Sequence, residues 1–258
     1  MARTVSASSS STTSVLTGTG TRALPGNVPA QERTKPPPSP AEDSPDIYSP
    51  NPALGSVVSY PSRCRAWGDA SYRGNCDGTL FKELVLRFRP RRVGDPMMGS
   101  GTTRDIITGL NRHAGTNIEY WGADLRAGFD LERDPLPGPF DFVWVHPPYW
   151  DIVRYSNDPR DLSATEGWSE FALRLSGCLL RCVAALAPGG HLAVLVGDIR
   201  KRGAYYSMQA ELLRHHSCSS SARPNSARRL ARTLGRHSHY HNKSWCRSSL
   251  LLTECFWT

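Results

Sequence analysis

Strand-like and helix-like segments alternate through the middle of this 258-residue chain, and this alternation restricts its fold more than any other feature. Four short segments are predicted strands: 92–94 as a short strand entry, 118–123, 140–145 and the buried strand 191–196. Three segments have a helical period: 80–88, 102–113 and 168–186. Strands joined through helices form βαβ units with right-handed crossovers. The sequence therefore predicts an α/β, Rossmann-like domain with a mainly parallel sheet and helices on both faces.

Composition divides the chain into three parts. Residues 1–59 are rich in Ser, Thr and Pro, and the run from Pro36 to Pro40 suits neither helix nor sheet, so this leader is predicted to be disordered. Residues 60–216 contain all the alternating segments and form the predicted domain. The alternation then stops, so residues 217–258 are predicted to be a basic tail of low order. A domain incomplete at its C-terminal side is compatible with this pattern.

The net charge of +8 is not in itself evidence for a nucleic-acid partner. Residues 217–258 hold seven Lys and Arg residues and one acid, whereas residues 60–216 are nearly neutral. The basicity therefore belongs to the tail and not to the domain that would carry the chemistry. No run of about 18 apolar residues occurs, so no membrane span is expected.

The cysteines and histidines indicate neither a disulfide framework nor a metal site. The seven cysteines are odd in number, without a Cys-x-x-Cys pair or a secretory leader, so a reducing cytoplasm is the expected setting. The cluster of His237, His239, His241 and Cys246 lacks the closed spacing of a tetrahedral site, so no metal is expected.

A glycine-containing loop follows the first predicted strand and opens a helix. Glycines in such a loop let the backbone turn sharply and approach a ligand, and the helix start offers unpaired N–H groups. The loop is no phosphate-binding P-loop, since no Gly-Lys-Ser/Thr follows, and Arg104 stands where the dinucleotide fingerprint requires a third glycine. An ordinary strand-to-helix turn is the simpler alternative. The candidate cofactor-binding residues here are Asp95, Pro96, Met97, Gly99, Ser100, Gly101 and Thr102.

Asp124 closes the next predicted strand. A carboxylate at this place, beside a glycine loop, can accept the two hydroxyl protons of a ribose. A helix N-cap or a surface acid is the alternative reading. Following the glycine loop, Asp124 is predicted to bind ribose.

The segment His146-Pro147-Pro148-Tyr149 follows the strand 140–145 and is the candidate catalytic motif. Two consecutive prolines fix φ and make a rigid kink that can aim a carbonyl at an amino group. Tyr149 offers an aromatic face on which a flipped base can stack. A plain Pro-Pro turn with aromatic packing is the structural alternative.

The glycine loop and the later Pro-Pro-Tyr motif together resemble the amino-methylating DNA methyltransferases, which act on N6 of adenine or N4 of cytosine. The resemblance covers about residues 60 to 200 and implies S-adenosyl-L-methionine as cofactor and a site-specific DNA methyltransferase activity. It implies methionine-moiety contacts from Asp95, Pro96, Gly99 and Gly101, a ribose contact from Asp124, and cofactor-pocket closure by the helix that starts at Leu80.

Two departures from this family stand out. His146 replaces the Asp, Asn or Ser that the family places before Pro-Pro-Tyr, although a neutral imidazole can still accept through one nitrogen and donate through the other. Only about 18 residues separate Tyr149 from the next helix, which leaves no room for a large recognition region. Arg200, Lys201 and Arg202 are therefore the candidates for DNA phosphate contact.

Other functions stay open at this point. Methylation of RNA or of a protein amide uses a similar kinked motif, and a non-catalytic remnant that only binds cofactor or nucleic acid would explain His146 and the unusual tail. Cytosine-C5 methylation is excluded, because it needs a thiolate nucleophile in a Pro-Cys dipeptide that this chain lacks.

Overall fold

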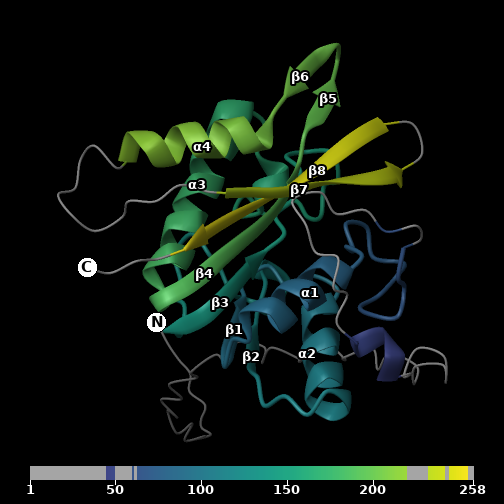
Figure 1. Cartoon of the computed structure of the whole chain (residues 1–258). Helices are drawn as coiled ribbons and strands as arrows, with labels where there is room; N and C mark the ends of the chain where they lie inside the picture. Colours follow the sequence, from purple (N-terminus) through teal and green to yellow (C-terminus); the bar gives the residue numbers. More distant parts are fainter. Residues whose placement is uncertain (1–44, 50–59, 61–62, 220–231, 242–243, 255–258) are drawn as a thin grey trace, which may run out of the picture. The chain divides into compact units, whose positions relative to one another are not determined.

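Six strands form one mixed sheet in the computed structural model (Figure 1). The structure describes residues 45–49, 60, 63–219, 232–241 and 244–254, all within one unit of the chain, Pro37–Thr258. The strand order is β2-β1-β3-β4-β8-β7. The strands span Arg92–Asp95 (β1), Glu119–Gly122 (β2), Phe140–Val145 (β3), Leu186–Gly197 (β4), Arg232–His241 (β7) and Ser244–Glu254 (β8). The first four are mutually parallel, and β8 pairs antiparallel with both β4 and β7.

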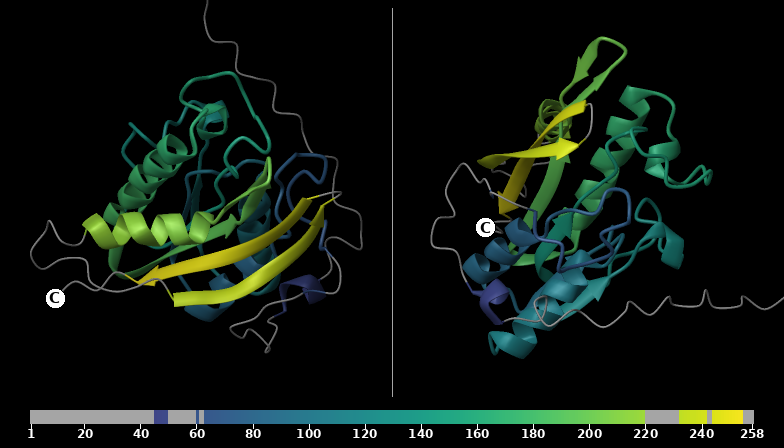
Figure 2. Two further views of the ribbon diagram at one scale, coloured as in Figure 1. Left: turned by 90° about the horizontal axis from the view of Figure 1, so that it is seen from above. Right: turned by 90° about the vertical axis from the view of Figure 1, so that its right-hand side faces the viewer.

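Helices cover both faces of this sheet, as the alternating sequence predicts, and Figure 2 shows the same layering from two further sides. The α-helices span Thr79–Phe88 (α1), Thr102–His113 (α2), Trp168–Ala184 (α3) and Met208–Ser219 (α4). Short 3-10 helices span Pro45–Tyr48 (η1), Leu125–Ala127 (η2) and Leu162–Ala164 (η3). A separate two-stranded hairpin, Ile199–Lys201 (β5) and Ala204–Tyr206 (β6), follows β4 and projects from the sheet.

The alternation of side chains along β3 and β4 divides the interior into two apolar cores. Phe142 and Trp144 of β3 pack with α1 and α2 on one face. Val143 and Val145 pack with α3 and α4 on the other. Because both faces of these strands are buried, their sequences read as continuous apolar runs, which is typical of parallel sheets. The predicted Rossmann-like α/β fold is therefore the observed architecture.

The sequence predicts a helix to residue 186 and a strand from residue 191, with Pro188-Gly189-Gly190 between them, and the start of β4 differs from this. The helix ends at Ala184, and β4 already begins at Leu186, which pairs with Phe140. The next partners are Phe142 and His191, so the Pro-Gly-Gly segment is accommodated as an irregularity within the strand. Bulges of this kind favour glycine and bend one strand without ending its pairing.

Part of the leader that was predicted to be disordered packs on the domain. Tyr48 in η1 is buried, and its hydroxyl accepts a 3.2 Å hydrogen bond from the Trp67 indole. The buried Lys82 ammonium donates to the carbonyls of Ile47 and Ser49, at 3.1 and 2.8 Å. Residues 45–49 thus belong with the domain, and the remainder of the leader, 1–44 and 50–59, lies outside the described residues.

The tail that was predicted to be of low order contains a hairpin. Its strand β8 pairs with β4 from His191↔Glu254 to Gly197↔Ser248, and β7 pairs with β8. The free edge of a buried strand has unpaired N–H and C=O groups, and an added antiparallel strand satisfies them irrespective of side-chain pattern. In the described parts of the chain, no helix has the length and apolar character needed to cross a membrane.

Candidate active site

The chain order of the strands defines where a ligand is expected. From β1 the chain goes to β2 on one side of β1 and then returns to β3 on the other side. The carboxyl ends of β1 and β3 therefore flank a topological switch point, which is where open α/β sheets bind their ligands. A cavity of about 280 Å³ lies there, lined by residues that follow β1, β2 and β3.

Asp95 ends β1 and is almost completely buried, with 2% of its surface exposed. Its Oδ2 accepts a 2.5 Å hydrogen bond from the Thr103 hydroxyl, and its Oδ1 accepts from the Met97 backbone N–H at 3.1 Å. Burial raises the pKa of this carboxyl to about 7, although both hydrogen bonds act to lower it. A buried carboxylate on a cavity wall attracts a cationic ligand.

The glycine loop depends on backbone conformations that disfavour other residues. Gly99 and Gly101 both have positive φ, at 55° and 83°, and Gly101 caps the start of α2. The Met98 N–H donates to the Ala123 carbonyl at 3.1 Å, which holds the loop against the end of β2. The loop is thus shaped by its glycines and tied to the neighbouring strand.

Asn75 supports the glycine loop from a segment in which the sequence indicated no site residue. Its side-chain oxygen accepts hydrogen bonds from the hydroxyls of Ser100 and Thr102, at 3.0 and 2.6 Å. Asn75 lies 25 residues before Ser100 and on the wall of the cavity. No local pattern in the sequence connects it with the loop.

Asp124 lines the cavity and also caps a short helix, so the two readings of its sequence position coincide. Its Oδ1 accepts a 3.0 Å hydrogen bond from the N–H of Ala127, which begins η2 as an N-cap does. Its Oδ2 pairs with the Arg126 guanidinium at 3.2 Å, and Arg126 also donates to the Gly99 carbonyl at 2.6 Å. Each carboxylate oxygen can accept more than one hydrogen bond, so ribose hydroxyls remain possible partners.

Asp130 is a further acid in the cavity wall that the sequence analysis missed. It is 5% exposed, and its Oδ1 accepts from the Glu132 N–H at 3.0 Å. Its Oδ2 is buried and has no hydrogen-bond partner among the residues that the structure describes, and the Arg133 guanidinium lies 3.7 Å away. Buried polar atoms are nearly always hydrogen-bonded, so this oxygen is available to a donor on a bound molecule. The loop that carries it has no recognisable motif.

The candidate catalytic motif enters the cavity only in part. His146 and Pro148 line the cavity, whereas Pro147 is buried and Tyr149 packs beside the core of α3. The His146 Nε2 lies 3.3 Å from the Tyr149 hydroxyl, and the two rings meet edge to face at an interplanar angle of 75°. Tyr149 is therefore placed to orient His146, and its predicted role as a stacking surface for a base is not evident from this placement.

Two tyrosines outside the predicted motifs form an aromatic part of the cavity wall. Tyr72 and Tyr155 both line it and stack on each other, with centroids 5.7 Å apart and an interplanar angle of 20°. The Arg126 guanidinium lies 4.7 Å from the centre of the Tyr72 ring. This set bridges the segment before α1, the loop after β2 and the loop after β3.

The basic residues predicted to contact phosphate lie in the β5–β6 hairpin, beyond the carboxyl end of β4. Arg200 and Arg202 are exposed. Lys201 is instead engaged: its ammonium pairs with Asp151 and lies 4.1 Å from the centre of the Trp150 ring. Trp150 directly follows the Pro-Pro-Tyr motif, so Lys201 holds that motif rather than facing outward.

The cavity thus brings most of the predicted cofactor-binding residues together with two of the four catalytic candidates. Gly101 shapes the loop from outside the lining. Where side chains are described, no group of three or more His, Cys, Asp or Glu residues is placed to hold a metal ion, and the side chains of the His237 to Cys246 cluster lie outside that part. The predicted residues that line the cavity are Asp95, Pro96, Met97, Gly99, Ser100, Thr102, Asp124, His146 and Pro148.

Comparison with known proteins gives structural neighbours only. No protein-family model and no curated protein matches the chain. TrmN from Thermus thermophilus is 20% identical with a TM-score of 0.35, over 68% of this chain and 48% of TrmN. The N-methyltransferase NodS from Bradyrhizobium japonicum is 14% identical with a TM-score of 0.34, over 67% of this chain and 84% of NodS. A putative class I S-adenosylmethionine-dependent methyltransferase from Listeria monocytogenes is 16% identical with a TM-score of 0.38, over 69% and 58%.

The chain therefore spans about half the length of TrmN. The TM-scores of all three neighbours against this chain lie below 0.5. Its fold assignment rests on the strand order and on the two-sided core described above.

Proposed function

We propose that the protein is an S-adenosylmethionine-dependent methyltransferase that methylates an exocyclic amino group of a DNA base, N6 of adenine or N4 of cytosine. The observation that carries this proposal is that Asp95, Asp124 and His146, from the ends of three parallel strands, line one cavity at the switch point of the sheet. The glycine loop and the Pro-Pro-Tyr motif resemble those of the amino-methylating DNA methyltransferases, and this resemblance supports methyl transfer as the reaction in that cavity.

The residues of the cavity suit the three parts of this cofactor. In its ionised form buried Asp95 offers negative charge to the cationic methionine end, beside a loop with no side chain at Gly99. Asp124 offers acceptors to ribose hydroxyls. Asp130 Oδ2, which has no hydrogen-bond partner among the described residues, offers an acceptor to an amino group such as that of adenine. The bound cofactor would supply an activated methyl group, which leaves its sulfonium for the attacking amine as the sulfur becomes a neutral thioether.

The acceptor side must orient a weakly nucleophilic amine and remove one of its protons. His146 can accept a hydrogen bond from the amine through whichever ring nitrogen is deprotonated. Its orientation is set by the Tyr149 hydroxyl, 3.3 Å from Nε2. The buried Pro147 and neighbouring Pro148 fix the backbone at this point. These residues position the amine and need no metal ion in the proposed reaction.

The cysteines near the cavity favour direct transfer over a covalent enzyme intermediate. Cys76 and Cys178 both lie on its wall. Burial raises the pKa of each thiol to about 12, so neither carries appreciable thiolate at neutral pH. A cysteine nucleophile is therefore not part of the proposed mechanism.

A methylation assay with three classes of acceptor tests the proposal. The full-length protein is incubated with S-adenosylmethionine carrying a deuterated methyl group and with unmethylated genomic DNA, total RNA or a protein extract. We expect labelled N6-methyladenine or N4-methylcytosine in digested DNA, detected by mass spectrometry. Label confined to RNA or protein would contradict the choice of substrate, and no label with intact cofactor binding would support a non-catalytic binding protein.

A further inference from the structure

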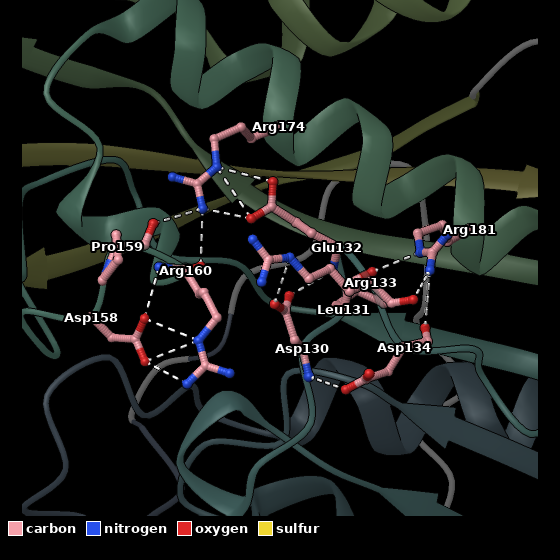
Figure 3. Close-up of polar contacts among 10 residues, drawn as sticks. All are labelled: Asp130, Leu131, Glu132, Arg133, Asp134, Asp158, Pro159, Arg160, Arg174 and Arg181. Carbon is pink, nitrogen blue, oxygen red and sulfur yellow. Dashed lines mark hydrogen bonds and ion pairs between the residues drawn. The ribbon is translucent and has the colours of Figure 1, made fainter.

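Arg174 lies on α3 with its side chain 18% exposed and joins two loops that flank the cavity (Figure 3). On one side it meets the Glu132 carboxylate with two parallel hydrogen bonds, Nε to Oε1 at 2.9 Å and Nη2 to Oε2 at 2.5 Å. This fork-to-fork geometry is specific to arginine, because a lysine ammonium cannot present two fixed parallel donors.

The same guanidinium holds the second loop through three other acceptors. Nη1 donates to the Thr165 hydroxyl at 2.8 Å. Nη2 donates to the carbonyls of Pro159 and Arg160, at 3.1 and 3.0 Å. Figure 3 shows Glu132 and the turn at Pro159 and Arg160 converging on Arg174 from different parts of the chain.

Both loops form part of the cavity wall. The first, residues 128–134, is called here the cofactor-side loop and contributes Asp130 and Glu132. The second, residues 156–165, is called the acceptor-side loop and contributes Asp158 and Asp161. The acceptor-side loop also contacts the residue directly after the candidate catalytic motif, because the Thr165 carbonyl accepts a 3.0 Å hydrogen bond from the indole of Trp150.

We infer that Arg174 is a positioning residue that couples the two loops, so that ordering of the cofactor-side loop by bound cofactor also orders the acceptor-side loop, which lines the same cavity as His146. This inference rests on the proposed function. Because one rigid guanidinium is shared, fixing Glu132 restricts where Thr165 and the Arg160 carbonyl can lie. Sites joined through a shared element of this kind bind their ligands interdependently.

Arg181 provides a matched control on the same helix. It lies seven residues, or two turns, after Arg174 and donates to the carbonyls of Leu131, Arg133 and Asp134. All of these acceptors belong to the cofactor-side loop. Substitution of Arg181 thus disturbs one loop, whereas substitution of Arg174 disturbs both.

Amide hydrogen exchange of the full-length protein tests the coupling, with S-adenosylhomocysteine as the probe ligand. In the free protein, Arg174→Lys should accelerate exchange in both loops by roughly tenfold to a hundredfold, the range expected when charge-assisted hydrogen bonds are lost. Arg181→Lys should accelerate it in the cofactor-side loop only. Added S-adenosylhomocysteine should protect both loops in the wild type but only the cofactor-side loop in Arg174→Lys.

The outcomes separate this inference from the proposed function. Unchanged exchange of the acceptor-side loop in Arg174→Lys, or an equal change there in Arg181→Lys, would overturn the coupling. Absence of any ligand protection in the wild type would contradict the proposed function and leave the free-protein comparison as the test of Arg174. If Arg174→Lys does not fold, Glu132→Gln removes the charged pair while keeping the side-chain shape, and the same loss of protection is expected.

Discussion

The Thr103 hydroxyl donates a 2.5 Å hydrogen bond to the Asp95 carboxylate and so joins the first turn of α2 to the end of β1 across the glycine loop. This bond keeps a buried acid pointing into the cavity. This hydrogen bond gives a structural role to Thr103, the second of the two threonines that follow Gly101. It also places a group whose ionisation is costly at the centre of the site.

Asp95 should make the protein's stability depend on pH. Its folded-state pKa, about 7, lies above the value near 3.9 expected in the unfolded chain. Its contribution is therefore fully favourable below about pH 3.9 and is lost as the pH rises through about 7. The free energy of unfolding of Asp95→Asn minus that of the wild type should therefore rise between pH 5 and pH 8, by on the order of a few kcal/mol. Urea unfolding of both proteins at the two pH values measures this difference, and a constant difference would contradict the buried, protonatable state of Asp95.

Gly74 should be intolerant of a side chain because of Tyr155. It has φ near +90°, and an added Cβ would lie 2.0 Å from the Tyr155 hydroxyl. Gly128 has the same φ but nothing within 4 Å of an added Cβ, so it serves as the control. Gly128→Ala should cost about 1–2 kcal/mol from backbone strain alone. Gly74→Ala should cost measurably more in chemical unfolding, and equal costs would argue against the packing of Tyr155 on this glycine.

Substitutions in the β5–β6 hairpin should distinguish residues that contact DNA phosphate from a residue that positions the neighbouring loop. Arg200 and Arg202 are exposed. Each substitution by alanine should therefore weaken the proposed DNA binding and reduce the slope of log binding constant against log salt concentration by about one. Lys201 is occupied by Asp151 and Trp150, so Lys201→Ala should slow methyl transfer and leave the salt slope unchanged. Fluorescence-anisotropy titrations over a range of salt concentrations give these slopes. A lower slope for Lys201→Ala alone would reverse the assignment.

Tyr149 should act on the transfer step and not on cofactor affinity, because it contacts His146 and is not part of the cavity wall. Tyr149→Ala should lower kcat by roughly tenfold to a hundredfold, the range typical of a mispositioned reacting group. Tyr149→Phe, which loses only the hydroxyl 3.3 Å from His146, should show part of this loss. Single-turnover rates and cofactor titrations separate the two effects, and a Phe variant with full activity would exclude the hydroxyl as the orienting group.

The sequence predicts those parts of this protein that depend on local patterns. Residues 102–113 have a helical period that begins directly after a glycine, and α2 has the same bounds. Strand β3 likewise matches its apolar run, 140–145. The glycine loop and the Pro-Pro kink could be located because each depends on the special backbone conformations of Gly or Pro.

The parts that could not be predicted depend on contacts between distant segments. Asn75 and Asp130 lie in loops without a motif, and only the folded chain brings them to the glycine loop and the cavity wall. Tyr48 is isolated in a Ser- and Pro-rich stretch, and its burial follows from a complementary space beside Gly109, where an added Cβ would lie 1.9 Å from its ring. Residue propensities and hydrophobic periodicity contain no information about such contacts between distant segments.

The measurement that most directly tests the central claim is a calorimetric titration of S-adenosylmethionine into the wild type, Asp124→Asn and Glu119→Ala. Asparagine keeps the N-cap to Ala127 but loses the charge and one acceptor oxygen. Glu119 begins β2, whereas Asp124 follows the other end of this strand, and Glu119 pairs with Arg92, so it controls for loss of a nearby acid. We predict one site in the wild type, at least about tenfold weaker binding in Asp124→Asn, as for lost hydrogen bonds to a charged group, and wild-type affinity in Glu119→Ala. No binding by the wild type, or equal affinity in Asp124→Asn, would contradict the account.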